Sequence, residues 1–549
     1  MQNLHLFLSD ITFVHSQIHS FPFPVFIYIT ETTYGEPEMS RTSIITGTII
    51  LTAANLITRC MGFFNRVYLT NTIGAEGIGL YQLILPVYGL AWSITSAGFT
   101  TTISSLTAQE NAYGQRGNIG RIVKQSIIIS IIISFCVSAF LFCFAEDLSL
   151  HIIKDSRTAL SLRLLALAVP FMSVGSCIRG FFLGMQSPLI PAISQVLEQT
   201  IRILTIYFLS SLFVPLGLTY ACLAAIAGIF LGELISCTYT AINYIHYKRK
   251  HHFIHKPVMS SSSIVYMILS MALPLSASRI SASLLSTAEN LLIPRQLELH
   301  GQNTAQALAT YGELTGMVMP LIFLPSACLM ATSISLIPEI SEAYAIQQKK
   351  RIQKTVSATF LFTSVIGFGS ASLFAVFPKE ICHIVYNRAA LGQVLFPLAF
   401  LCPFLYAQTT LHGLLNGLGE QFFLFWNNIL SSLICITAIW FAMPIYGIAA
   451  FLGGWFLSLL FSVGTALFIL WKKTGVFPSF LQCILKPLLA GAASGLIIKY
   501  LIRISEPSKL LFTLSIVGMG FLYLFFLFLL GCLSRNELSL ISVHKKSRS

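Results

Sequence analysis

Apolar segments long enough to cross a lipid bilayer follow one another along nearly the whole chain. A membrane-spanning helix needs about 20 apolar residues, and we count about fourteen segments of that length. We place them at 44–70, 79–105, 122–145, 159–185, 189–212, 217–245, 264–292, 311–338, 355–378, 391–417, 421–443, 445–471, 482–502 and 510–532. Backbone N–H and C=O groups find no water inside a bilayer, so such segments must be helical. The sequence therefore predicts an all-α, polytopic membrane protein in which hardly any loop has room for a soluble domain.

The charges of the chain are few and lie mainly between these segments. Only 10% of the 549 residues are charged, whereas a soluble domain carries about 25%. The formal net charge is +13, and with a cytoplasmic N-terminus the basic clusters fall in the inner loops. Those clusters are Arg116–Lys124, Lys248–Lys256, Lys349–Lys354, Lys472–Lys473 and Lys545–Arg548. This bias predicts a cell-membrane protein with both termini in the cytoplasm, and it reflects topology rather than nucleic-acid binding.

Residues that would signal an enzyme or a metal site are missing from the sequence. The 12 cysteines are scattered, nearly all through apolar segments, and form no CxxC pair, so we expect neither disulfides nor metal ligands. No HExxH, GxSxG or Walker A pattern occurs. His251, His252 and His255 lie in a basic loop, and we interpret them as solvated rather than metal-binding. We therefore expect no catalytic residues, no metal and no cofactor.

The chain contains an internal repeat of six segments. Four short matches occur in order at a spacing of 231 or 233 residues. They pair Thr102–Ser104 with Ser333–Ser335, Tyr113 with Tyr344, Pro170-Phe171 with Pro403-Phe404, and Arg179–Gly184 with His412–Gly417. Because the unit holds an even number of spans, both copies enter the membrane from the same side. This arrangement predicts two lobes related by an axis along the membrane normal, with a site between them.

The repeat divides the chain into six parts. We expect an N-terminal extension outside the fold (1–38), a first six-helix lobe (39–246), a cytoplasmic linker (247–262), a second six-helix lobe (263–475), two extra C-terminal helices (476–533) and a basic cytoplasmic tail (534–549). Residues 1–38 contain no lysine or arginine, so they lack the basic start of a signal peptide.

Two arginines inside the first apolar segment point to a binding site. An arginine at bilayer depth costs at least a few kcal/mol on insertion scales, so it usually faces a cavity or a partner. Asn55, Arg59, Gly62 and Arg66 follow a helical spacing that places all four on one face. We interpret this face as the lining of a hydrated, cationic cavity whose ligand is an anion.

The first segment of the second lobe carries a matching arginine. Arg279 lies on a polar stripe with Ser276, Ser283, Ser286 and Asn290. Two repeat-related helices with an arginine each fit a shared cavity between the lobes. The alternative is that each arginine snorkels or pairs with a carbonyl or an acid. Arg59 and Arg279 lie roughly at mid-span, which favours the cavity.

Other charged residues within the spans leave two interpretations open. Glu198 and Arg202 stand four residues apart in the order that favours a helical ion pair. They either neutralise each other in packing or line the cavity, and Glu198 is also a candidate to carry a coupling proton. The same choice applies to Arg179, whereas Glu233 and Glu289 are lone acids with a weaker claim to function.

Glycine patterns are interpreted as structural. Gly180-x-x-x-Gly184 and Gly413-x-x-x-Gly417 predict close helix packing. No Rossmann strand precedes Gly74-x-x-Gly77-x-Gly79, so we interpret it as an extracytoplasmic turn rather than a phosphate loop.

Several motifs resemble those of a known family. They are Thr58–Arg66, Ile73–Tyr81, Arg179–Gly184, Ser194–Arg202, Tyr311–Gly316 and Pro338–Glu342. In order along the chain, they resemble the stage V sporulation protein B family. That family belongs to the polysaccharide-exporter branch of the multidrug/oligosaccharidyl-lipid/polysaccharide flippase superfamily and is similar to lipid II flippases. The resemblance implies that arginines in the first helix of each lobe line the cavity, which carries over to Arg59 and Arg279 and less directly to Arg66. Pro338-Glu339 departs from the commoner Pro-Ala.

Together these features predict a flippase that moves a polyprenyl-pyrophosphate-linked glycan outward. The resemblance implies lipid II, the peptidoglycan precursor, as the substrate and spore-cortex synthesis as the role. A multidrug exporter of similar fold is one alternative, but it would need acidic residues in the cavity. A membrane glycan polymerase or a non-transporting sporulation scaffold are the others. We expect membrane lipids and peptidoglycan synthases as partners, no nucleic acid, and a monomer.

Overall fold

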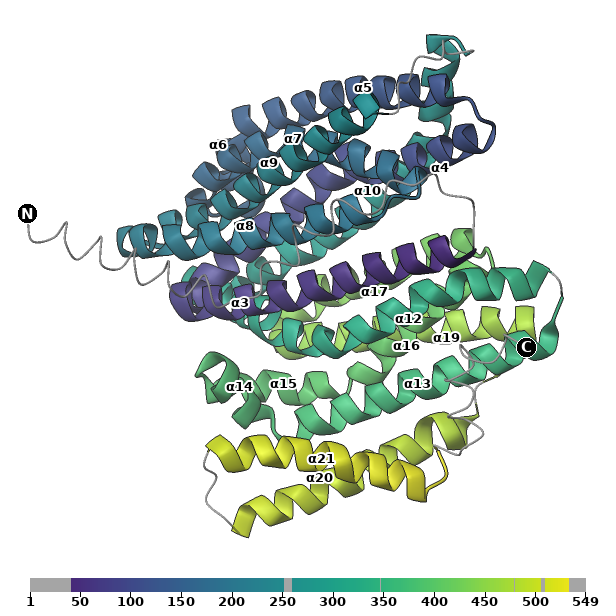
Figure 1. Cartoon of the computed structure of the whole chain (residues 1–549). Helices are drawn as coiled ribbons and strands as arrows, with labels where there is room; N and C mark the ends of the chain where they lie inside the picture. Colours follow the sequence, from purple (N-terminus) through teal and green to yellow (C-terminus); the bar gives the residue numbers. More distant parts are fainter. Residues whose placement is uncertain (1–40, 251–258, 346, 478, 505–508, 533–549) are drawn as a thin grey trace, which may run out of the picture. The chain divides into compact units, whose positions relative to one another are not determined.

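The computed structural model describes residues 41–250, 259–345, 347–477, 479–504 and 509–532. The chain divides into two compact units, Met1–Thr46 and Gly47–Ser549, and the architecture below is that of the second. Every regular element in the described residues is helical (Figure 1), which confirms the predicted all-α class. The expected extension 1–38, the tail 534–549 and the three loop histidines lie outside the described residues.

The first long helix contains two of the predicted spans. It is α3 (Arg41–Trp92), and its backbone breaks at Gly74, where φ is 73° and ψ is −176°. Side chains rarely adopt this conformation, so a glycine is needed there. The helix then continues through η1 (Ser93–Ala97) into α4 (Gly98–Ala112). The expected turn over 74–79 is therefore confined to Gly74, and Gly77 and Gly79 are helical.

The remaining long helices follow the predicted order. In the first lobe they are α5 (Arg116–Cys143), α7 (Ala159–Gly184), α8 (Leu189–Phe213) and α9 (Leu218–Lys250). The second lobe has α10 (Ser261–Leu299), α11 (Thr304–Gly312), η5 (Glu313–Val318), α12 (Met319–Ala345), α13 (Lys349–Val376), α15 (Gly392–Ala399), α16 (Cys402–Gly417), α17 (Gln421–Phe441) and α19 (Ile448–Thr474). Helices α20 (Lys486–Ile504) and α21 (Lys509–Leu529) follow.

Length and composition alone give a lower number of spans than we predicted. Eleven helices in the described part of the chain qualify, or up to 12 if the bent pair Ala389–Ala399 and Cys402–Gly417 is one span. The difference arises at this pair, at Ile49–Ala112, which merges two predicted spans, and at Leu514–Leu529, which is short. The chain is a multi-pass membrane protein.

Short helices and turns join the spans at two ends of the helices. We call one the Gly74 end; it holds α6 (Ala145–Asp147), η2 (Leu148–Ile153), η3 (Ser156–Thr158), η4 (Val214–Leu216), α14 (Pro378–Tyr386), η6 (Ala389–Leu391) and α18 (Met443–Tyr446). We call the other the Arg116 end, where α4 turns into α5.

The internal repeat is visible in the backbone at a single spacing. Residues with positive φ pair as Gly114 with Gln347, Lys154 with Asn387, and Gln186 with Gly419, each pair 233 residues apart. Helices α5 and α13 begin and end at the same spacing. Two of the sequence matches, at 231, are thus two residues out of this register. The duplication itself is supported, because chain turns of the same handedness recur at equivalent places.

Helix α10 packs against helices of both lobes. It contacts α4, α5 and η1 of the first lobe, and α11 and α17 of the second. Ile264 and Ile268 of α10 share an apolar cluster with Phe99, Ile119 and Ile122. Helices α20 and α21 pair with each other and pack on α13 (Figure 1).

Candidate functional site

The arginines that the sequence singles out in the first span have no protein partner. Arg59 and Asn55 are exposed on α3 and Arg66 is half-buried. Neither arginine forms a hydrogen bond or an ion pair with any described residue. A Cβ on Gly62, which shares their face, would lie 3.5 Å from Nε2 of Gln199 on α8. Arg66 lies within electrostatic range of the phenol groups of Tyr81 and Tyr386.

Arg279 meets an aromatic ring of the first lobe. Its guanidinium lies 5.9 Å from the ring centroid of Trp92 on α3. Both side chains are exposed, and Arg279 has no carboxylate partner among the described residues. A cation over an indole face is attracted to the ring quadrupole. Sequence reasoning missed Trp92, since only the register between two helices distant in sequence brings the ring to Arg279.

The polar stripe of α10 runs antiparallel along the second arm of α3 and the start of α4. Ser276 lies against Gly98, and Ser283 lies near Gly89. Farther along, Thr287 Oγ1 donates to the Pro86 carbonyl oxygen at 3.3 Å. Asn290 accepts a hydrogen bond from the Tyr311 hydroxyl at 3.0 Å. The stripe is therefore largely a contact between the lobes, with Arg279 at its exposed part.

The other membrane-depth charges of the first lobe are partnered. Arg202 Nη2 lies 2.6 Å from Glu198 Oε1, as the i, i+4 spacing predicts. The Tyr88 hydroxyl donates to Glu233 Oε1 at 2.7 Å. Arg179 Nη1 donates to Ser236 Oγ at 3.4 Å. These residues join α3, α7, α8 and α9 through polar contacts that leave Glu198 and Arg202 mutually neutralised.

The structure does not gather every expected residue at one point. Arg279 lies on Trp92, Arg66 lies near Tyr81 and Tyr386, and Arg202 is held by Glu198. Glu289 is partly buried on α10. Across the described ranges, no three His, Cys, Asp or Glu side chains gather as a metal site.

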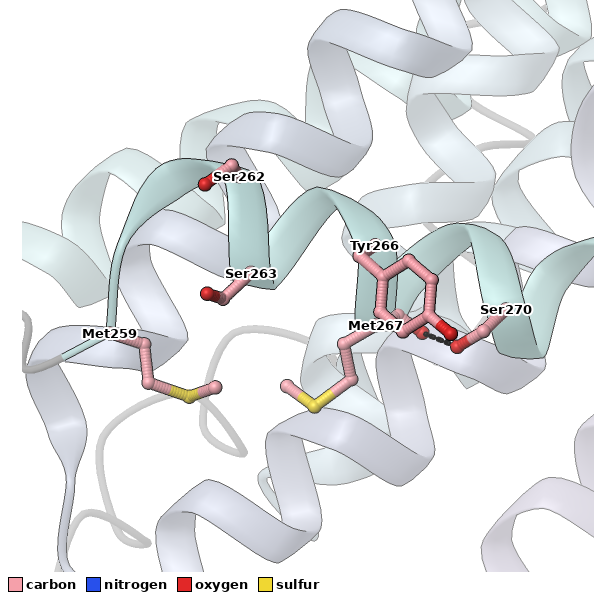
Figure 2. Close-up of a pocket in the computed structure, with 6 residues that line it drawn as sticks. All are labelled: Met259, Ser262, Ser263, Tyr266, Met267 and Ser270. Carbon is pink, nitrogen blue, oxygen red and sulfur yellow. Dashed lines mark hydrogen bonds between the residues drawn. The ribbon is translucent and has the colours of Figure 1, made fainter.

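One cavity lies away from the arginines, at the start of α10. It has a volume of about 530 Å³ and is lined by Met259, Ser262, Ser263, Tyr266, Met267 and Ser270 (Figure 2). Its lining includes no charged side chain, so it does not suit an anionic headgroup.

A family model for polysaccharide biosynthesis proteins matches residues 44–344. This match covers more than half of the chain. The chain belongs to the polysaccharide biosynthesis protein family.

Relatives of this family member include two proteins of Bacillus subtilis (strain 168). Stage V sporulation protein B is 29% identical over 402 residues, which is 72% of this chain and 77% of the relative. The lipid II flippase MurJ is 25% identical over 339 residues, 57% of this chain and 60% of the relative. These similarities confirm the resemblance seen in the motifs, and they agree with the expectation of a non-enzymatic protein.

A solved structure supports the fold of this polysaccharide biosynthesis protein. A lipid II flippase MurJ in an inward closed conformation superposes with a TM-score of 0.66 at 14% identity, over 87% of this chain and 98% of that one. At this identity the likeness shows the fold, which is that of a multi-pass flippase-type protein.

Proposed function

We propose that this protein flips a polyprenyl-pyrophosphate-linked glycan outward across the cell membrane. The observation that carries the proposal is the unpaired state of Arg59, Arg66 and Arg279. A cation that a membrane helix retains without a carboxylate partner is available to an anionic ligand. A pyrophosphate offers several charged oxygens for charge-assisted hydrogen bonds with guanidinium groups.

The paired arginine of the first lobe sharpens this argument. Arg202 keeps its carboxylate Glu198 at 2.6 Å, so it needs no ligand for neutrality. The three unpaired arginines lie on α3 and α10, the opening helices of the two lobes. A headgroup between these helices would meet cations from both lobes, while the polyprenyl tail stays in the bilayer.

Lipid II is the substrate that we propose, with spore-cortex synthesis as the role. Sequence similarity to stage V sporulation protein B and to a lipid II flippase supports this choice. The loop charges support an orientation with both termini in the cytoplasm, so the Gly74 end faces outward. Peptidoglycan synthases are the partners that would receive the product, and the proposed active form is a monomer.

The rival functions make different demands on the same residues. A multidrug exporter that binds cationic compounds requires acids at the site, but the exposed charges on α3 and α10 near mid-span are arginines. A glycan polymerase requires catalytic acids, and a scaffold requires no transport at all. Transport measurements on defined lipids therefore separate the four functions.

The deciding experiment uses the purified full chain in lipid vesicles. Fluorescent lipid II is placed in both leaflets, and a membrane-impermeant reagent reports how much reaches the outer surface. Other undecaprenyl-linked glycans and a cationic dye are tested in parallel. We expect lipid-linked pyrophosphates to move and the dye to stay. Movement of the dye alone contradicts the proposal, as does polymerised glycan without flipping.

A further inference from the structure

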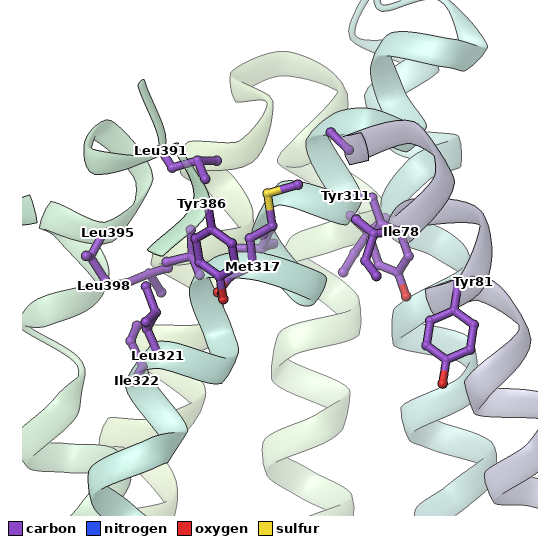
Figure 3. Packing of buried hydrophobic residues seen from close by; sticks show 14 of the residues in the cluster. Ile78, Tyr81, Tyr311, Met317, Leu321, Ile322, Tyr386, Leu391, Leu395 and Leu398 are labelled. Atoms are coloured by element: carbon purple, nitrogen blue, oxygen red, sulfur yellow. The ribbon is translucent and has the colours of Figure 1, made fainter. Parts of the chain in front are cut away.

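The two lobes touch backbone to backbone where α3 crosses α11. A methyl group added to Gly79 would overlap the carbonyl oxygen of Leu308. A methyl group added to Gly312 would overlap the carbonyl oxygen of Ala75 and lie 2.6 Å from the Gly79 nitrogen. Both positions therefore require glycine, because any side chain would push the two helices apart. Figure 3 shows the neighbouring Ile78 and Tyr311 at this contact.

This contact is reciprocal. Gly79 and Gly312 are 233 residues apart, and so are Ala75 and Leu308, which is the spacing of the backbone repeat. Each glycine meets the residue that lies four positions before its own repeat partner. Reciprocal contacts between equivalent residues occur only around a two-fold axis. The axis that relates the lobes therefore passes between Gly79 and Gly312.

The contact is also easy to separate. Two hydrogen bonds cross it, from Gln82 Nε2 to the Thr315 carbonyl and from the Tyr311 hydroxyl to the Gln82 carbonyl, both long at 3.4 Å. The ion pairs of the Gly74 end close within one lobe. Arg157 binds Glu76 and Asp155 of the first lobe, and Arg388 lies 3.6 Å from Glu313 of the second. Parting the lobes here breaks none of these ion pairs.

We propose that the Gly79–Gly312 crossing is the closing contact of the lobes at the Gly74 end. It seals this end on the symmetry axis while the arginines are reached from the other end, and it parts when the headgroup leaves. Glycine serves this purpose because two bare backbones fit closely through dispersion contacts and weak Cα–H···O contacts, with no side chains to interlock. The proposal rests on the proposed flipping function only for its transport readout.

A removable disulfide across the contact provides the first test. A Cβ on Gly316 would lie 3.5 Å from the Cβ of Ile78, within the range for a disulfide. In a full chain whose 12 native cysteines are replaced, the pair Ile78→Cys and Gly316→Cys is oxidised in vesicles. We expect the bond to form, flipping of lipid II to fall to the level of protein-free vesicles, and reduction to restore it.

The matched control joins two helices on one side of the boundary. A Cβ on Gly495 would lie 3.9 Å from the Cβ of Val376, so Val376→Cys with Gly495→Cys links α20 to α13. Oxidation of this pair should leave flipping unchanged. Equal flipping by the oxidised and reduced Ile78–Gly316 pair overturns the proposal, and so does failure of that pair to form a bond in the membrane.

Distance measurements test the closing contact without any substrate. Spin labels at Leu216 and Tyr446, both exposed at the Gly74 end, report the separation of the lobes. We expect Gly79→Ala and Gly312→Ala each to remove the shorter distances. Gly89→Ala on the same helix should keep them, because its nearest atom is 3.9 Å away. Unchanged distances in the Gly79 and Gly312 variants refute the closing contact, whereas wild-type vesicles that flip nothing refute the proposed function instead.

Discussion

At the residue scale, the arginines differ in whether the protein itself neutralises them. Arg202 holds Glu198, whereas Arg59, Arg66 and Arg279 hold no carboxylate in the described part of the chain. The cost of placing a cation in the membrane is therefore not offset within the protein at these three positions. A pyrophosphate headgroup offsets it, which ties substrate binding to residues that are otherwise unfavourable.

Replacing Arg59 or Arg279 by alanine should abolish flipping without blocking insertion. A hydrogen bond to a charged group contributes about 1.5–3 kcal/mol, so each loss should weaken headgroup binding roughly tenfold or more. Removing a charge eases insertion, so protein levels should hold. The measurement is lipid II flipping in vesicles at equal protein. Arg163→Ala is the control, since Arg163 forms an exposed pair with Glu146. Normal flipping by both variants would remove the basis of the arginine site.

Trp92 offers a second residue-scale prediction. Its ring lies under the Arg279 guanidinium, and a cation–π contact at an exposed site contributes about 0.5–1 kcal/mol. We expect Trp92→Leu to weaken binding of a pyrophosphate lipid about two- to fivefold, and Trp92→Phe to retain most of it. Trp440→Leu, at another exposed indole, is the control. Equal binding by the leucine and phenylalanine variants would mean that the ring does not position Arg279.

At the element scale, helix existence follows from the sequence but helix contacts do not. Apolar length placed the spans, and the glycine motifs correctly predicted close packing: Gly180 and Gly184 lie against the carbonyl oxygens of Thr100 and Ser104. Periodicity also placed Asn55, Arg59 and Arg66 on one face. It did not show that the Arg279 helix runs along α3, because antiparallel register depends on three-dimensional packing. Gly77 and Gly79 were misplaced in a turn, since sequence alone does not distinguish a turn glycine from a contact glycine.

Gly180→Ala tests this packing directly. Its new methyl would lie 2.7 Å from the Thr100 carbonyl oxygen, so the helices must separate or strain. Overpacking of this kind destabilises by about 1–3 kcal/mol. We expect a lower thermal unfolding midpoint in lipid nanodiscs, whereas Gly120→Ala, with nothing within 4 Å, should unfold like the wild type. Equal midpoints for both variants would contradict the close contact.

At the scale of the whole molecule, the direction of charge movement sets the energetics. The proposed headgroup is anionic and moves outward from a cell interior that is electrically negative. Each negative charge that crosses gains about 2.3 kcal/mol per 100 mV. Two lobes that rock about a site fixed near the axis move their own arginines little, so most of this energy remains available.

Dissipating the membrane potential should therefore slow flipping more than dissipating a pH gradient. Vesicles with a clamped potential and a separately varied proton gradient provide the measurement. A rate that follows the proton gradient and ignores the potential would contradict the expectation, and Glu198 would become the first residue to replace.

Helix α10 also sets the order in which the protein matures during synthesis. The helices of the first lobe leave the ribosome before α10, yet Phe99, Ile119 and Ile122 find Ile264 and Ile268 only on α10. The first half is thus incomplete when its own last helix is inserted, and the opening helix of the second half completes it. Two halves expressed from separate genes, divided within 251–258, should accumulate only when made together. The unit that was duplicated is smaller than the unit that folds.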